Sequence, residues 1–106
     1  MLITTQDEFA EYEIVKTLGM VKGNTIRARH IGKDIMAALR NMIGGEILEY
    51  TKMLAESREQ ALDRMIENAT AMGADGIVCA RFTTSAVMQG AAELLAYGTA
   101  VTLKKK

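Results

Sequence analysis

The sequence has no proline, no tryptophan, one cysteine and one histidine among its 106 residues. Because no proline and no Gly/Ser-rich or single-sign run divides the chain, we expect one domain that spans residues 1–106. A single cysteine permits no disulfide within the chain, which is typical of a protein of the reducing cytoplasm. No run of about 18 apolar residues is present, so we expect no membrane-spanning helix.

The chain also lacks an excess of charge of one sign. Lysine and arginine number 13, and aspartate and glutamate number 13, so the formal net charge is zero. A neutral chain exerts no general attraction on nucleic acid or on an acidic membrane, and it tolerates self-association. The first residues, MLITTQDEFAEYE, carry no basic leader and no long apolar run, so we expect no signal peptide.

The hydrophobic pattern predicts an α+β fold with the element order β-α-α-β-β. Helical spacing of apolar residues predicts one helix from Ile31 to Ile43 and a second from about Glu46 to Met72, ended by Gly73. We expect strands at Met1–Thr5, Tyr12–Arg29, Ile77–Thr84 and Ala91–Leu103. Ser85–Ala92 is expected to hold the connection between the last two strands. Gly19 and Gly23 interrupt the long strand, where we expect a bulge or turn. These elements predict two layers, an antiparallel sheet with both helices on one face.

The final strand is apolar on both faces. From Ala91 to Leu103 it reads AAELLAYGTAVTL, with Glu93 as its only charge. Side chains alternate along a strand, so each face carries its own set of residues. One face would carry Leu95, Tyr97, Val101 and Leu103, and the other would carry Leu94, Ala96, Gly98 and Ala100. A two-layer domain needs only one apolar sheet face. We therefore expect the face away from the helices to be apolar and to be covered by another copy of the chain.

Several stretches of the chain resemble the YbjQ-like family. They are ARHIGKDIMAALRNMIGGEILEYTKML, ESREQALDRM, GADGIVCARFTTS and AAELLAYGTAV, and they cover almost the whole chain. The paired glycines Gly44 and Gly45, the RFTTS strand end and the AYGTAV strand are the most specific parts. The resemblance implies a dodecin-like subunit that assembles as a homopentameric ring. It also brings a heavy-metal-binding label, with no assigned mechanism and no catalytic residue.

The metal label depends on few residues. Soft metal ions need several thiolates or imidazoles at fixed spacing, and the chain has only Cys79 and His30. These two lie on different predicted elements, so one chain cannot form a Cys/His cluster. We interpret Cys79 as a small buried thiol that packs as a hydrophobe. The alternative is that a ring brings copies of Cys79 or His30 together on its axis, which would form a metal site between subunits.

Basic residues gather at the start of the first predicted helix. They are Arg27, Arg29, His30 and Lys33. Helix N-termini bind anions, and neighbouring cations strengthen that binding, so these four residues are the candidate anion-binding site. The alternative is a surface whose cations are neutralised by Asp34 or by acidic residues of a neighbouring chain.

No set of residues resembles a catalytic site. A single histidine, without an acid at the required spacing, offers no Ser-His-Asp or Cys-His arrangement, and no glycine pattern resembles a phosphate loop. Glu56, Glu59 and Asp63 fall on adjacent helical turns, but Lys52 and Arg58 lie among them, which favours a solvated face over a cation site. We therefore expect a ring-forming binding or structural module that is not an enzyme and holds no cofactor. The alternative is a heavy-metal-binding protein whose site lies between subunits.

Overall fold

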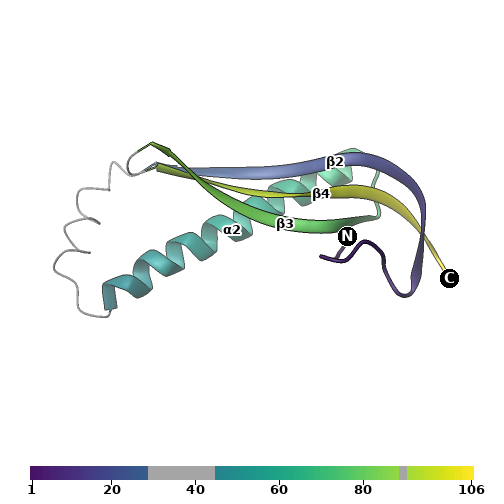
Figure 1. Ribbon diagram of the computed structural model, residues 1–106, viewed down its shortest axis with the longest axis horizontal. Coiled ribbons are helices and arrows are strands. Elements are labelled where there is room, and N and C mark those ends of the chain that lie inside the picture. Colours follow the sequence, from purple (N-terminus) through teal and green to yellow (C-terminus); the bar gives the residue numbers. More distant parts are fainter. Residues whose placement is uncertain (29–44, 89–90) are drawn as a thin grey trace.

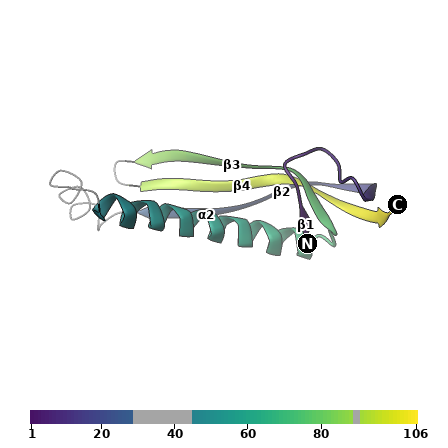
Figure 2. The same ribbon diagram turned by 90° about the horizontal axis from the view of Figure 1, so that it is seen from below.

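The computed structural model of the protein describes residues 1–28, 45–88 and 91–106 (Figure 1). Its elements, in chain order, are β1 (Leu2–Ile3), β2 (Tyr12–Ala28), α2 (Gly45–Ala71), β3 (Gly76–Met88) and β4 (Ala91–Lys105). The strands form one sheet, and α2 lies across one of its faces (Figure 2). The described part of the chain is therefore an α+β fold of two layers.

The sheet is mixed, with the strand order β1-β3-β4-β2. β4 lies in the middle and pairs antiparallel with β2 and β3, whereas the short β1 pairs parallel with β3 through Leu2↔Gly76 and Ile3↔Ile77. The prediction of an antiparallel sheet is therefore wrong at this pair. The cause is the path of the chain. After β1 the chain crosses to the opposite edge of the sheet, where β2 begins, so β1 and β2 run in the same direction.

The predicted long helix is confirmed as α2, with each end one residue from its predicted position. Its buried residues Ala61, Met65 and Ala69 pack on the sheet in a core that also contains Val21, Ile77, Ala80, Ala96 and Ala100. Gly73 follows the helix with a φ of +83°, a conformation that favours glycine. The helix predicted from Ile31 to Ile43 lies outside the described residues. Within the described part of the chain, one helix covers this face of the sheet.

The backbones of β2 and α2 approach each other closely at Gly23. A Cβ added to Gly23 would fall on main-chain atoms of Ala61 and Met65, so only glycine fits at this position. The expected bulge or turn at Gly23 is wrong, because the strand continues through it in register with Ala96. The expectation is confirmed at Gly19, which has a φ of +122° and lies beside a shift in the register of β2 and β4.

The hairpin of β3 and β4 is longer than the sequence pattern predicts. Its pairing continues through Ser85↔Glu93 and Ala86↔Ala92, so the connection predicted over Ser85–Ala92 is wrong. The prediction fails because the small residues of this segment have little preference for strand, whereas a continuous backbone ladder with β4 holds them extended.

Candidate functional site

The chain itself covers one end of the sheet face opposite α2, which we call the far face. Residues 4–11 arch over this face on their way from β1 to β2 (Figure 2). Phe9 lies against Gly76, where an added Cβ would be 3.1 Å from Phe9 Cε2 and 2.8 Å from Leu103 Cδ1. Val101 is the strand partner of Gly76 and is only 1% exposed. The expectation that another copy covers Val101 is therefore wrong, because the N-terminal segment already does so.

The rest of the far face is open. Leu95 and Tyr97 of β4 belong to it, and Tyr97 is 36% exposed. On β2, Met20 and Ile26 belong to the same face, with exposed fractions of 74% and 59%. We call Met20, Ile26, Leu95 and Tyr97 the far-face patch. These apolar side chains have no covering layer within the described part of the chain.

Polar residues divide the far-face patch. Lys22 is paired with Tyr97 and Asn24 with Leu95, and Asn24 Nδ2 donates a hydrogen bond to Glu93 Oε2 at 3.1 Å. The expectation of a wholly apolar far face is therefore wrong, because alternation on the neighbouring strands places polar residues beside the apolar residues of β4. The far-face patch is therefore a mixed surface, and mixtures of apolar and polar residues are usual in protein–protein contacts.

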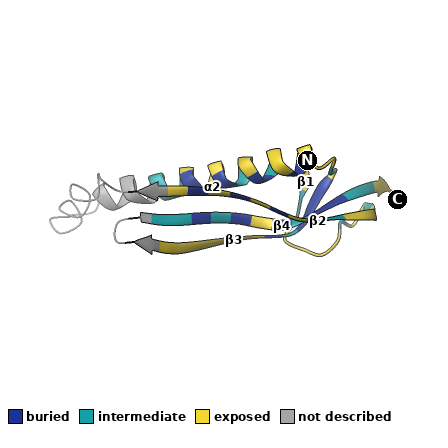
Figure 3. Ribbon diagram, turned by 90° about the horizontal axis from the view of Figure 1, so that it is seen from above, coloured by how far each residue is buried: buried dark blue, intermediate teal, exposed yellow. Residues whose placement is uncertain are grey.

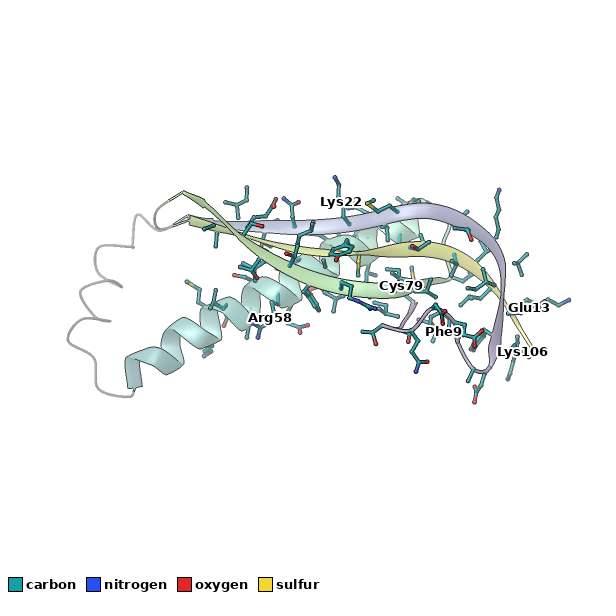
Figure 4. The ribbon with its side chains drawn as sticks, viewed as in Figure 1. Phe9, Glu13, Lys22, Arg58, Cys79 and Lys106 are labelled. Carbon is teal, nitrogen blue, oxygen red and sulfur yellow. The ribbon has the colours of Figure 1, made fainter. Side chains whose placement is uncertain are left out.

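Cys79 lies in a β-bulge (Figure 4). The register of β3 and β4 shifts between Val78 and Arg81, and Cys79 has a φ of +55°. Its backbone N–H donates a hydrogen bond to Gln6 O at 2.9 Å, and the residue is half-buried. The interpretation of Cys79 as a small buried thiol is met only in part, because the bulge takes the residue out of the regular alternation and leaves it half-buried.

The described residues contain no cluster suited to a metal ion, since no three His, Cys, Asp or Glu side chains gather among them. His30 lies outside the described residues. A metal site between subunits stays a prediction.

The predicted anion site falls almost entirely outside the described residues. Arg27 is the one member whose backbone is described, and it pairs with Ala92 close to the end of β2. Arg29, His30 and Lys33 lie beyond that end. The anion site therefore also stays a prediction.

The outer face of α2 carries the acidic residues considered as a cation site. Glu56, Glu59 and Asp63 line a wide, shallow depression together with Lys52 and Arg58. Figure 4 labels Arg58 on α2. All five residues are open to solvent or partly so, and the two cations oppose the binding of a metal cation. The arrangement supports the interpretation of this surface as a solvated helix face.

A small apolar pocket lies beside β3 on the side of the sheet that faces α2. Its volume is about 190 Å³, and it is lined by Ile3, Thr4, Thr5, Leu62, Met65, Ala80, Arg81 and Phe82. Binding sites for small molecules usually enclose about 300–1,000 Å³ and contain a few convergent polar groups. The pocket is therefore a recess of side-chain size and not a cofactor site.

The exposure of β3 beyond this pocket was not predicted from the sequence. Residues Arg81–Ala86 are all exposed, and Phe82 has 51% of its surface open. The signal that could have revealed it is the run of Thr83, Thr84 and Ser85. Three successive polar residues do not alternate between a buried face and a solvent-exposed face. Such a run is typical of a strand that has neither face covered.

Comparisons with known proteins find relatives along the whole chain. The YbjQ family model, described as "Putative heavy-metal-binding", matches residues 1–104. A UPF0145 protein of Methanococcus vannielii is 61% identical over 105 residues, which cover 99% of this chain and 100% of that protein. A UPF0145 protein of Methanosarcina acetivorans is 58% identical over 106 residues, which cover 100% of both chains.

A solved structure shares the fold. It is that of a protein with unknown function of the DUF74 family from Pediococcus pentosaceus, with a TM-score of 0.64, 19% sequence identity and 98% of both chains covered. Among the described residues, no helix is both long enough and apolar enough to cross a membrane.

Proposed function

Since the chain belongs to the YbjQ-like family, we propose that it is a dodecin-like subunit of a homopentameric ring, a binding or structural module and not an enzyme. The observation that carries the proposal is the far-face patch. Its residues Leu95 and Tyr97 lie on the central strand of the sheet, where an apolar face is normally covered. We infer that a neighbouring subunit supplies this cover.

A closed ring requires a contact between two different surfaces, so the far-face patch of one subunit would pack on another part of the next. Tyr97 is the expected anchor, because aromatic residues near the centre of an interface provide much of the binding energy. Lys22 and Asn24 lie between the apolar residues of the patch, so the neighbouring subunit would have to supply polar partners for them. The net charge of zero allows this association, because the subunits carry no excess charge that would make them repel each other.

Native mass spectrometry of protein purified without an affinity tag tests this proposal, because it reports both the ring size and any retained ligand. We expect the parent protein to have the mass of five subunits, or of ten if two such rings associate through a separate contact. Tyr97→Lys should dissociate the ring, since it would bury a charge in the contact. The matched control Ala71→Lys adds the same charge at the exposed end of α2 and should leave the ring intact. A monomer mass for the parent at micromolar concentration, or an intact ring for Tyr97→Lys, would contradict the proposal.

The second candidate function is heavy-metal binding, which is favoured by the description of the family. We propose that any tight site lies between subunits and uses copies of Cys79 or His30, with fewer than one ion per subunit. Elemental analysis of the purified protein tests this. A full equivalent of zinc or copper per subunit that is lost in Cys79→Ser or His30→Ala would refute a shared site, and a metal-free protein would refute metal binding.

We further propose that the ring works in the cytoplasm, without a nucleic acid or membrane partner. The single cysteine and the balanced charge of the chain support this. Fractionation of cells that express the untagged protein tests the compartment, and recovery outside the cytoplasm would contradict it.

A further inference from the structure

The outer edge of β3 is paired over only part of its length. β1 covers Gly76 and Ile77, and beyond them the N–H groups of Cys79 and Ala80 donate hydrogen bonds to Gln6 O and Thr4 O. From Phe82 to Ala86, no described residue donates to or accepts from this edge. A free strand edge presents a row of backbone donors and acceptors on which another strand can pair.

The composition of the free edge favours pairing. All residues from Arg81 to Ala86 are exposed, as Figure 3 shows for this part of β3. The guanidinium of Arg81 donates to Thr5 O at 2.7 Å and to Ala80 O at 2.9 Å, so this cation is held against its own chain. The segment FTTSA that follows contains no charge, glycine or proline, and its aromatic and β-branched residues have high strand preference.

The opposite edge of the sheet is protected. On β2, Lys22 O accepts a hydrogen bond from Asn68 Nδ2 at 2.7 Å, and Asn24 O accepts one from Arg64 Nη1 at 2.6 Å. Two register shifts also interrupt the β2 ladder. Side chains over the edge and bulges within it are the usual devices that prevent edge-to-edge pairing. β3 also has two register shifts, between Val78 and Arg81 and between Ala86 and Met88, but they flank the stretch from Phe82 to Ala86. Over this stretch no side chain of the described residues binds the edge, so it is available for pairing.

We propose that this free edge of β3 pairs antiparallel with the same edge of a second copy of the chain, about a two-fold axis. Because the N–H of Ala80 points outward to Thr4 O, alternation turns the backbone groups of Phe82, Thr84 and Ala86 outward as well. The longest pairing places Thr84 on the axis, with Phe82 opposite Ala86 of the partner subunit. Three such pairs would form about six hydrogen bonds.

The strand that pairs with this edge is best supplied by the same edge of a second copy, and not by the β2 edge of that copy. An edge that pairs with itself about a two-fold axis needs no second matched surface, and the β2 edge is already occupied by side chains of α2. α2 packs against Ile77 and Ala80 in the first part of β3. In Figure 2 α2 lies closest to β2, and the last part of β3 lies at the opposite edge of the sheet, which leaves room beside that edge for a second strand.

This two-fold contact does not depend on the proposed ring. The ring would use the far face, whereas the two-fold contact uses the edge of β3. If both exist, the β3 edges join two rings, and the two contacts can be broken separately. Tyr97→Lys should leave the edge-paired dimer, and a change in the edge should leave the single ring.

Cysteine cross-linking in a Cys79→Ser background tests the register. In a hydrogen-bonded antiparallel pair the Cα atoms are about 5.5 Å apart, a separation that a disulfide spans. Thr84→Cys should therefore form a covalent dimer under mild oxidation. The matched control Phe82→Cys is also exposed, but its two copies would lie about 13 Å apart along the strands, so little dimer should form. Equal cross-linking of the two variants would overturn the proposed register.

Proline substitution tests the contact itself. Thr84→Pro removes an outward N–H that the subunit does not use, which an edge strand tolerates, so native mass spectrometry should show half the parent mass with an unchanged far-ultraviolet circular dichroism spectrum. Thr84→Val keeps the N–H and should keep the parent mass. If Thr84→Pro does not fold, Thr84→Lys introduces a charge at the axis with the same expected result. The parent mass retained in a folded Thr84→Pro or Thr84→Lys variant would overturn the proposal.

Discussion

Replacing Gly23 with alanine should destabilise the protein far more than the addition of one methyl group suggests. The new Cβ would overlap main-chain atoms of Ala61 and Met65. A side chain in the way could rotate, but main-chain atoms in the middle of a helix cannot move without shifting α2. That shift would disturb the contacts of the buried residues along the helix.

The magnitude follows from two opposing terms. Overpacking a close contact costs about 1–3 kcal/mol, and the upper part of this range applies because the obstacle is backbone. The loss of glycine from the unfolded chain returns about 0.4–1 kcal/mol. The net loss in the free energy of unfolding should be about 2 kcal/mol, which corresponds to about 8 °C in Tm for a chain of this length. Denaturant unfolding at a fixed protein concentration measures it, because self-association makes stability depend on concentration.

Two controls make the Gly23 prediction specific. Met20→Ala alters the same strand at a residue that is 74% exposed, and it should change stability by less than about 0.5 kcal/mol. Met65→Ala in the Gly23→Ala background should not restore stability, because the overlap is with the backbone of Met65 and not with its side chain. A Gly23→Ala protein as stable as the parent, or one rescued by Met65→Ala, would show that the close approach of backbones does not require this glycine.

Three further predictions follow from other contacts. Arg64→Ala with Asn68→Ala should free two carbonyls at the β2 edge and promote aggregation, measured by light scattering during heating; a clear solution would argue against edge protection by α2. Asp75→Ala should cost about 1 kcal/mol of unfolding free energy, because its carboxylate accepts the N–H of a β4 residue at 2.9 Å; an unchanged denaturation midpoint would contradict this. If the parent binds phosphate or sulfate in a salt-sensitive way, the double variant Arg27→Ala with Arg29→Ala should lose that binding, measured by calorimetry, and keep the native mass. If the parent binds no anion and the double variant loses the assembly, the two cations form an assembly contact instead.

The features that could be predicted from the sequence are local ones. The helix from Gly45 to Ala71 follows from a long apolar repeat and from Gly73 after its end, because both signals act over one turn of the chain. The inward set Leu94, Ala96, Gly98 and Ala100 follows from strict alternation, and all four residues are buried.

The features that could not be predicted depend on contacts between distant segments. Nothing near Leu2 specifies its parallel pairing with Gly76. Gly23 resembles a strand interruption until α2 is placed on it. The cover over Val101 comes from residues 4–11, which have no helical or strand pattern of their own. For the candidate binding residues, the sequence shows which side chains could bind a metal ion or an anion. Their positions in an assembly depend on contacts between subunits, which no local pattern encodes.

The central position of β4 has a consequence for synthesis of the protein. β4 follows β2 and β3 in the chain, yet these two strands are joined in the sheet only through it. Until residues beyond 91 have emerged, β2 has no strand partner and β3 has only the short β1. The pairing of β2 with β4 joins residues that lie far apart in the chain. Such long-range pairing is slow to form and leaves strand edges open meanwhile. A chain that stops before β4 should therefore be unable to form the three-stranded part of the sheet, and the nascent protein should depend on protection from aggregation until β4 is made.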